Sequence, residues 1–235
     1  MHNYSMKAYV INLDSRTDRW NSVLAQEKNL ALPLVRVPAV SSNEVSSSEF
    51  TTLAVNATWG SHQRAMRLFL ASNDEYGLIL EDDFILSPSW SKTTLDKFQT
   101  LGCDFLQVGY LITTPLDLIE IKLKSTVDLA LKLLNRLTSM GLIPKSWFGD
   151  RLLVREQDNV PFSFVCNDIR PGAHGYIVSR RFALASQQFN NPVILSTDAL
   201  FMALGWMRTF KFMRIRKSVI SQSDSATSIT ERFLS

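Results

Sequence analysis

Three consecutive carboxylates, Glu81, Asp82 and Asp83, are the residues of this 235-residue chain best suited to chemistry. They follow the apolar run 78–80, and a short run of Leu and Ile between glycine and proline is typical of a buried strand. Acidic groups at the end of such a strand are costly without a positive partner, and divalent cations take carboxylate oxygens as ligands. The spacing of Glu81 and Asp83 therefore predicts a metal site at the carboxyl edge of a sheet. A solvated acidic turn is the alternative.

A second polar group follows an apolar run near the N-terminus and supplies positive charge. Arg16 and Arg19 are three residues apart, so they share one face at the start of an expected helix. Backbone N–H groups at a helix N-terminus bind phosphate, and arginine adds bidentate hydrogen bonds. In a parallel sheet this turn lies at the same edge as the acidic turn, so a metal-bridged phosphate ligand would satisfy both groups. The alternative is a surface ion pair of Asp18 with either arginine.

The composition is that of an ordinary globular protein, with 46% hydrophobic and 20% charged residues. A length of 235 residues suits one domain, or one domain with an insertion. The net charge of +3 gives no reason to expect a nucleic-acid partner. Two cysteines are too few for a disulfide framework and residues 1–7 lack a signal-peptide core, so a reducing, cytoplasmic compartment is expected. The absence of a Walker loop and of a GxGxxG fingerprint argues against ATPase and dinucleotide-binding functions.

The elements that must position these residues alternate between strand and helix. Strands are predicted at 7–13, 34–37, 76–80, 104–108, 173–178 and 210–220, the last of them basic. Helices are predicted from Asp14 or Ser15 to 29, at 58–72, at 89–98, from a cap at Ser179 to 188, and from Asp198 to 204. This alternation predicts an α/β fold with a mostly parallel central sheet.

The pattern changes at 110–165, which we interpret as a helical and loop insertion within a single domain spanning 1–235. Charges recur every three or four residues over 116–137, which predicts an amphipathic helix. Such a helix packs on the sheet or on a partner subunit, or it lies on a membrane surface. Trp147 and Phe148 follow, and their aromatic faces suit a sugar ring or cover the core.

The segment 10–19, VINLDSRTDR, resembles the opening of glycosyltransferase family 25, which includes lipopolysaccharide, lipooligosaccharide and collagen galactosyltransferases. Further landmarks of that family follow in order: the Ser61-His62 pair, LILEDD at 78–83, GAHGYIVS at 172–179, Asp198, and the segment 221–229. Each motif is weak alone, but the ordered set is specific and covers the chain apart from 110–165. The chain departs from the family pattern at Ala57 and Thr58, where Gly-Cys is usual, and at Ser41, where Asp is frequent.

The resemblance implies a GT-A-like, Rossmann-type domain that uses a UDP-sugar donor with Mn²⁺ or Mg²⁺. It implies an inverting hexosyltransferase, a β-galactosyltransferase before a glucosyltransferase, acting on a saccharide or glycolipid acceptor. The implied setting is lipopolysaccharide or other surface glycan assembly, in the cytoplasm or peripherally at the inner face of the plasma membrane. One alternative is a degenerate member that serves as a nucleotide-sugar-binding or scaffold module. Another is a nucleotidyl-sugar pyrophosphorylase, although no glycine-rich, lysine-bearing loop follows the first strand.

The site residues follow from the same resemblance. A metal held by a DxD-like arrangement stabilises the charge that develops on the departing nucleoside diphosphate. Asp83 is the expected direct metal ligand, with Glu81 and Gln222 as helpers. Asp198 is the expected base for the acceptor hydroxyl, with an N-cap as its alternative role and Asp168 as the fallback base. Donor contacts are expected from Asn12, Leu13, Arg16, Arg19, His62, Glu81 and Asp82, and acceptor contacts from Trp147, Phe148, His174 and Tyr176. Arg214, Arg216 and Lys217 either face an anionic ligand or form a solvated strand face.

Overall fold

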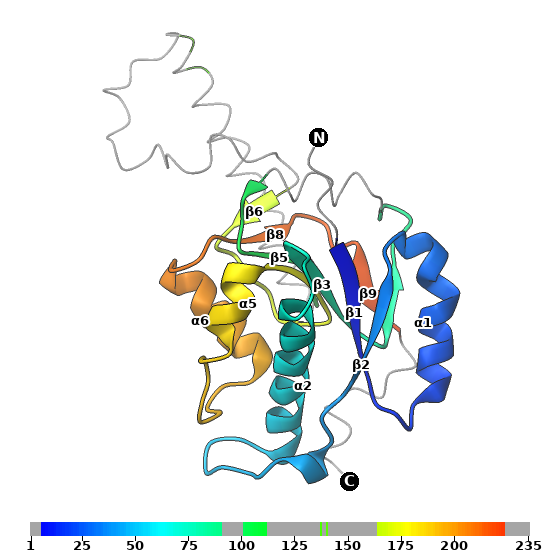
Figure 1. Ribbon diagram of the computed structural model, residues 1–235. Coiled ribbons are helices and arrows are strands. Elements are labelled where there is room, and N and C mark those ends of the chain that lie inside the picture. The colour runs from blue at the N-terminus through cyan, green and yellow to red at the C-terminus, as the bar shows by residue number, and fades with distance from the viewer. Residues whose placement is uncertain (1–5, 91–100, 112–136, 138–139, 141–163, 224–235) are drawn as a thin grey trace.

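The computed structural model describes residues 6–90, 101–111 and 164–223, together with positions 137 and 140 (Figure 1). Most of the predicted helix 89–98, nearly all of the predicted helix 116–137, and the residues Trp147 and Phe148 lie outside these ranges. Within the described ranges, no helix combines the length and the apolar character that a membrane crossing requires.

A mixed sheet forms the centre of the described fold. Its strands are β1 (Met6–Asn12), β2 (Leu34–Pro38), β3 (Tyr76–Glu81), β4 (Phe84–Leu86), β5 (Phe105–Gly109), β6 (Phe164–Cys166), β7 (Gly175–Ser179), β8 (Phe212–Ile215) and β9 (Ile220–Gln222). The main path runs β2-β1-β3-β7-β5-β8-β6, and β9 pairs with β4 and β5 beside that path.

The fold is α/β as predicted, but its sheet is not mostly parallel. Strand β1 pairs in parallel with β2 and β3, and β5 pairs in parallel with β8 and β9. Strand β7 enters between β3 and β5 and runs antiparallel to both, while β4 with β9 and β6 with β8 are also antiparallel. The expectation of a mostly parallel sheet assumed that each helix returns the chain to a parallel neighbour, and β7 breaks that rule.

Helices cover both faces of the sheet. Helix α1 (Thr17–Leu30) lies on one side, and α2 (Leu53–Leu70), α5 (Arg180–Ser186) and α6 (Thr197–Met207) lie on the other (Figure 1). The alternation along β1 shows why both sides are needed: Ala8 and Val10 pack in the core cluster that contains α1 residues, whereas Tyr9 packs in the cluster of α2 and α6. A strand buried on both faces reads as a continuous apolar run, as the sequence shows here.

Capping decides where the helices begin. Helix α2 starts at Leu53, earlier than the predicted position 58, because the Thr52 side chain accepts a hydrogen bond from the backbone N–H of Val55. Ser179 caps α5 as predicted. The residue before α1 is Arg16, which makes no side-chain capping bond, so the predicted cap at Asp14 or Ser15 is wrong.

Candidate functional site

The acidic turn lies between β3 and β4 and is held by the C-terminal strand. Glu81 is the last residue of β3, and Asp82 and Asp83 form the turn before β4. The backbone carbonyl of Asp83 accepts a hydrogen bond of 2.8 Å from the N–H of Ser223. Because β9 also pairs with β4, Gln222 comes to lie beside Glu81, 141 residues away in sequence.

Both carboxylate oxygens of Asp82 accept hydrogen bonds from residues near the N-terminus. Nη1 of Arg19 donates to Oδ1 at 2.8 Å, and Nδ2 of Asn12 donates to Oδ2 at 2.6 Å. Arg36 in turn donates twice to Oδ1 of Asn12, at 2.9 and 2.6 Å. The two turns therefore meet at one edge of the sheet as predicted, and Asp82 joins them.

Arg16 forms the surface ion pair with Asp18 that was predicted as the alternative to phosphate binding. Its guanidinium donates to both carboxylate oxygens of Asp18, at 2.9 and 2.8 Å. This hydrogen bond lowers the pKa of Asp18 to about 2. Arg16 thus forms a surface ion pair, and Arg19 is engaged with Asp82, so a phosphate ligand would have to compete with carboxylates for either guanidinium.

Asp83 differs from its neighbours because one of its oxygens is buried without a partner. Oδ1 has no hydrogen bond within the described structure, and Oδ2 lies 3.8 Å from Nη1 of Arg19. Burial first, and then the charges of Glu81 and Asp82, raise the pKa of Asp83 to about 6. A buried carboxylate oxygen in a negative field is an arrangement that a bound cation relieves.

Glu81 is held from two sides. Nε2 of His62 lies 3.5 Å from Oε1, and Nε2 of Gln222 donates to Oε2 at 3.3 Å. Burial opposes ionisation of Glu81, but these hydrogen bonds from His62 and Gln222 help to lower its pKa below the usual value. Glu81 is therefore an anion beside Asp83.

Asp198 is close enough to Glu81 for the charge of Glu81 to affect its pKa. Burial raises its pKa, backbone hydrogen bonds from Gly172 and Ala173 oppose that rise, and the charge of Glu81 adds to it. The N-cap of α6 is Ser196, whose hydroxyl accepts from the N–H of Ala199 at 3.3 Å. The capping alternative for Asp198 is therefore wrong, and its carboxylate accepts backbone hydrogen bonds from Gly172 and Ala173 instead.

The fit of a metal ion is supported by part of the predicted ligand set. Asp83 offers an unpartnered buried oxygen and Glu81 an anionic carboxylate, which are donors that hard cations prefer. Gln222 is adjacent, although its amide nitrogen is bonded to Glu81. Over the ranges 6–90, 101–111 and 164–223, no three His, Cys, Asp or Glu side chains converge as a complete ligand group.

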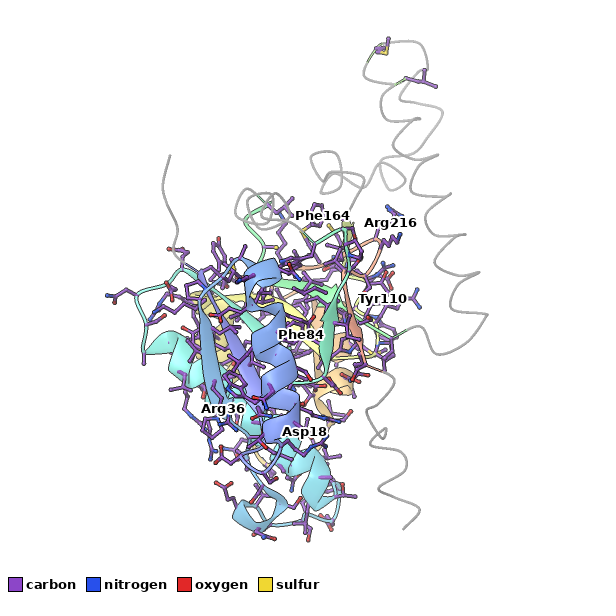
Figure 2. All side chains as sticks on the ribbon, turned by 90° about the vertical axis from the view of Figure 1, so that its right-hand side faces the viewer. Asp18, Arg36, Phe84, Tyr110, Phe164 and Arg216 are labelled. Carbon is purple, nitrogen blue, oxygen red and sulfur yellow. The ribbon has the colours of Figure 1, made fainter. Side chains whose placement is uncertain are left out.

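Asp168 is engaged in an ion pair, which argues against its role as the fallback base. Nη2 and Nε of Arg214 donate to its Oδ2 at 2.5 and 3.2 Å, and Nε of Arg170 lies 3.6 Å from Oδ1. The Arg214 side chain is only 1% exposed, so it does not form a solvated strand face. In Figure 2, Arg216, from the same basic segment, lies toward the upper edge of the described fold and Asp18 lies in its lower part.

We expect Asp168→Asn to destabilise the fold and to leave turnover intact. The substitution leaves the buried Arg214 charge without its anion, which costs about 3–5 kcal/mol in comparable buried pairs. Urea denaturation measures the loss, and kcat of the remaining folded protein tests the role in catalysis. A stable variant with greatly reduced kcat would restore Asp168 as a candidate base.

His174 and Tyr176 do not face an acceptor. Their side chains are 1% and 0% exposed. The His174 ring is enclosed between two glycines, because a Cβ at Gly109 or at Gly172 would lie 2.8 Å from a ring carbon. Burial also lowers the pKa of His174, so the imidazole is held neutral. The predicted acceptor contacts of both residues are therefore wrong.

The enclosure of His174 predicts a large effect at Gly172. Gly172 has φ +106° and its Cβ would meet the ring and the backbone nitrogen of Leu111 at 2.9 Å, so Gly172→Ala should cost more than about 2 kcal/mol. Gly102→Ala is the matched control, because Gly102 has φ +55° but no atom within 4 Å of its Cβ. It should cost about 1 kcal/mol. Equal losses in urea denaturation of the two variants would contradict the close packing.

Three contributions were not foreseen from the sequence. Arg36 anchors Asn12, the backbone of Ser223 holds Asp83, and Tyr176 bonds to His62 from within the core. The alternation along 34–37 carried a weak signal for Arg36, since a charged residue within an apolar strand needs a partner. The other two contacts depend on strand order and leave no local signal.

Comparisons with known proteins add little to this geometry. No protein-family model matches the chain, and no curated protein matches it. One similar solved structure is described as a crystal structure of a mycobacterial protein, with 12% identity and a TM-score of 0.35 over 91% of this chain. The chain spans 65% of the length of that structure. What can be stated is the class: a mixed α/β protein with a buried acidic turn at one edge of its sheet.

Proposed function

We propose that this protein is an inverting, metal-dependent glycosyltransferase with a GT-A-like fold. It transfers a hexose, galactose before glucose, from a UDP-sugar to a saccharide acceptor in surface glycan assembly. The observation that carries the proposal is the buried, unpartnered oxygen of Asp83 beside the anionic carboxylate of Glu81. The charge of Glu81 also acts on the carboxylate of Asp198. The ordered motifs shared with glycosyltransferase family 25 support it.

The chemistry assigns one role to each carboxylate. The acceptor hydroxyl oxygen attacks the anomeric carbon of the donor sugar, and the bond from that carbon to the phosphate oxygen breaks. The electron pair leaves with the nucleoside diphosphate, and the hydroxyl proton passes to the carboxylate of Asp198. The raised pKa of Asp198 makes it a better proton acceptor than an ordinary aspartate.

The metal would be held by Asp83 and Glu81, with Gln222 adjacent. When bound there, it supplies Lewis-acid stabilisation of the diphosphate leaving group. The remaining residues organise the turn: Asp82 binds Arg19 and Asn12, and so holds the N-terminal segment against it.

A thermal-shift panel tests the proposal directly. UDP, UDP-galactose, UDP-glucose and UDP-N-acetylglucosamine are each added with and without Mn²⁺, because a ligand that binds only the folded state raises the melting temperature. We expect a Mn²⁺-dependent rise with one UDP-sugar, which is then tested for transfer to saccharide acceptors. No rise with any of the four would overturn the UDP-sugar assignment.

A second candidate function is a nucleotide-sugar-binding or scaffold module without turnover. It is favoured by the engagement of Arg16 with Asp18 and of Arg19 with Asp82, which leaves both guanidinium groups bound to carboxylates. The two candidates differ in one measurement. A module binds the UDP-sugar without releasing UDP, whereas a transferase releases UDP when an acceptor is present.

A further inference from the structure

A buried series of three side chains runs from the core to the acidic turn. Tyr176 lies on β7, His62 on α2 and Glu81 at the end of β3, so three separate elements meet there. The Tyr176 hydroxyl lies 2.8 Å from Nδ1 of His62, and Nε2 of His62 lies 3.5 Å from Oε1 of Glu81. Both ring-bearing residues are fully enclosed, whereas the Glu81 side chain is 25% exposed.

The two partners of His62 indicate which ring nitrogen donates a hydrogen bond and which accepts one. A phenol can donate to or accept from a ring nitrogen, whereas the carboxylate of Glu81 can only accept, so the consistent pairing has Nδ1 accepting from Tyr176. Nε2 must then be the N–H, and it points at the carboxylate of Glu81. The opposite tautomer would place a lone pair of Nε2 against the carboxylate, and it is disfavoured.

We propose that Tyr176 and His62 are positioning residues that hold the Glu81 carboxylate through this single hydrogen-bonded series. The inference rests on the proposed function, because Glu81 is the residue expected to act beside Asp83 at the metal. Gln222 holds the other oxygen of Glu81 at 3.3 Å, so the carboxylate is oriented from both sides. Partners of this kind orient a metal-binding group and tune its affinity.

The packing contacts of Tyr176 involve its ring, so a substitution can remove the hydroxyl and keep these contacts. The ring stacks on Phe105 with centroids 5.0 Å apart and planes at 18°, and it meets Phe201 edge-on at 5.0 Å. Phe201 also meets the ring of His62 edge-on. Tyr176→Phe keeps these aromatic contacts and removes only the donor to Nδ1.

Nitrogen-15 spectra of the histidine rings test the tautomer without any ligand. The chain has three histidines, and the loss of signals in His62→Gln assigns those of His62. We expect a protonated Nε2 and an unprotonated Nδ1 in the native protein, and a mixture of tautomers in Tyr176→Phe. A proton on Nδ1 in the native protein, or identical spectra in both proteins, would overturn the proposal.

Mn²⁺ titration in the presence of UDP tests the consequence for the site. We expect Tyr176→Phe to weaken Mn²⁺ binding about 10-fold or more, as for other groups that orient a metal ligand. His62→Gln can place an amide N–H where Nε2 lies and should bind within about threefold of the native protein, whereas His62→Asn cannot and should lose about 10-fold or more. Native affinity in Tyr176→Phe and His62→Asn would overturn the positioning role.

Tyr110→Phe is the matched control for general destabilisation. Tyr110 is also buried, and its hydroxyl donates to the backbone carbonyl of Arg216 at 2.7 Å, in a different part of the described sheet. We expect this variant to bind Mn²⁺ as the native protein does. An equal loss of affinity in Tyr110→Phe would show that the effect of Tyr176→Phe is not specific. If the native protein binds no Mn²⁺ with UDP, the proposed function fails, and the ring spectra still decide the hydrogen-bonded series.

Discussion

Asp83→Asn is expected to abolish metal-dependent donor binding while making the metal-free protein more stable at neutral pH. Transfer should fall at least about 100-fold, because the charge on the leaving group loses its electrostatic support. The stability gain has a separate cause. Asp83 is ionised at neutral pH at the cost of burial and of repulsion from Glu81 and Asp82.

The sign of the stability effect follows from the raised pKa of Asp83. Its pKa is about 6 in the folded protein against an ordinary 3.8, so the folded state binds the proton more tightly. Stability that is fully present below pH 3.8 is lost as the pH rises toward 6. At about 1.4 kcal/mol for each pH unit, the loss above pH 6 amounts to about 3 kcal/mol, and Asp83→Asn should recover much of it.

Urea denaturation of the metal-free protein at pH 4 and pH 7.5, with Mn²⁺ and UDP titration at pH 7.5, measures both effects. Asp18→Asn is the control with the opposite electrostatics, because Arg16 lowers the pKa of that exposed carboxylate to about 2. It should not stabilise the protein at pH 7.5 and should leave binding intact. The prediction fails if Asp83→Asn is less stable than the native protein at pH 7.5 and still binds UDP with Mn²⁺.

Asp198→Asn is expected to remove turnover while leaving donor binding in place. If Asp198 accepts the proton of the acceptor hydroxyl, its loss should lower kcat about 10²–10⁴-fold. In the proposed site Mn²⁺ and UDP are bound through Asp83 and Glu81, so KM for the donor should change little. The variant should also not lose stability at neutral pH, because burial and the charge of Glu81 raise the pKa of Asp198 and make its ionised form costly.

The pH profile separates this role from a structural one. Activity of the native protein should rise with pH as Asp198 ionises, with a midpoint above the ordinary aspartate value of 3.8. With Mn²⁺ and donor saturating, so that Asp83 stays ionised, this rise should be absent from the residual activity of Asp198→Asn. Ser196→Ala is the control within the same helix turn: it removes the N-cap hydrogen bond, costs about 1 kcal/mol of stability, and should leave kcat unchanged. Native kcat in Asp198→Asn would rule out Asp198 as the base.

Local sequence patterns were sufficient to predict the elements around the site. The apolar runs of β1 and β3 end where polar residues begin, and this transition placed Glu81, Asp82 and Asp83 at a sheet edge. Side-chain periodicity and burial act within one element, so they are readable from neighbouring residues. For the same reason the cap at Ser179 was predicted correctly.

Strand order and the choice of charged partners depend on contacts between segments that are distant in the sequence. Nothing local indicates that β7 enters antiparallel between β3 and β5, yet this places Tyr176, 114 residues from His62 in sequence, beneath that histidine. The same is true of Arg19, which binds Asp82 across 63 residues. Charge pairing and desolvation depend on distance in space, so the raised pKa of Asp83 exists only once these segments meet.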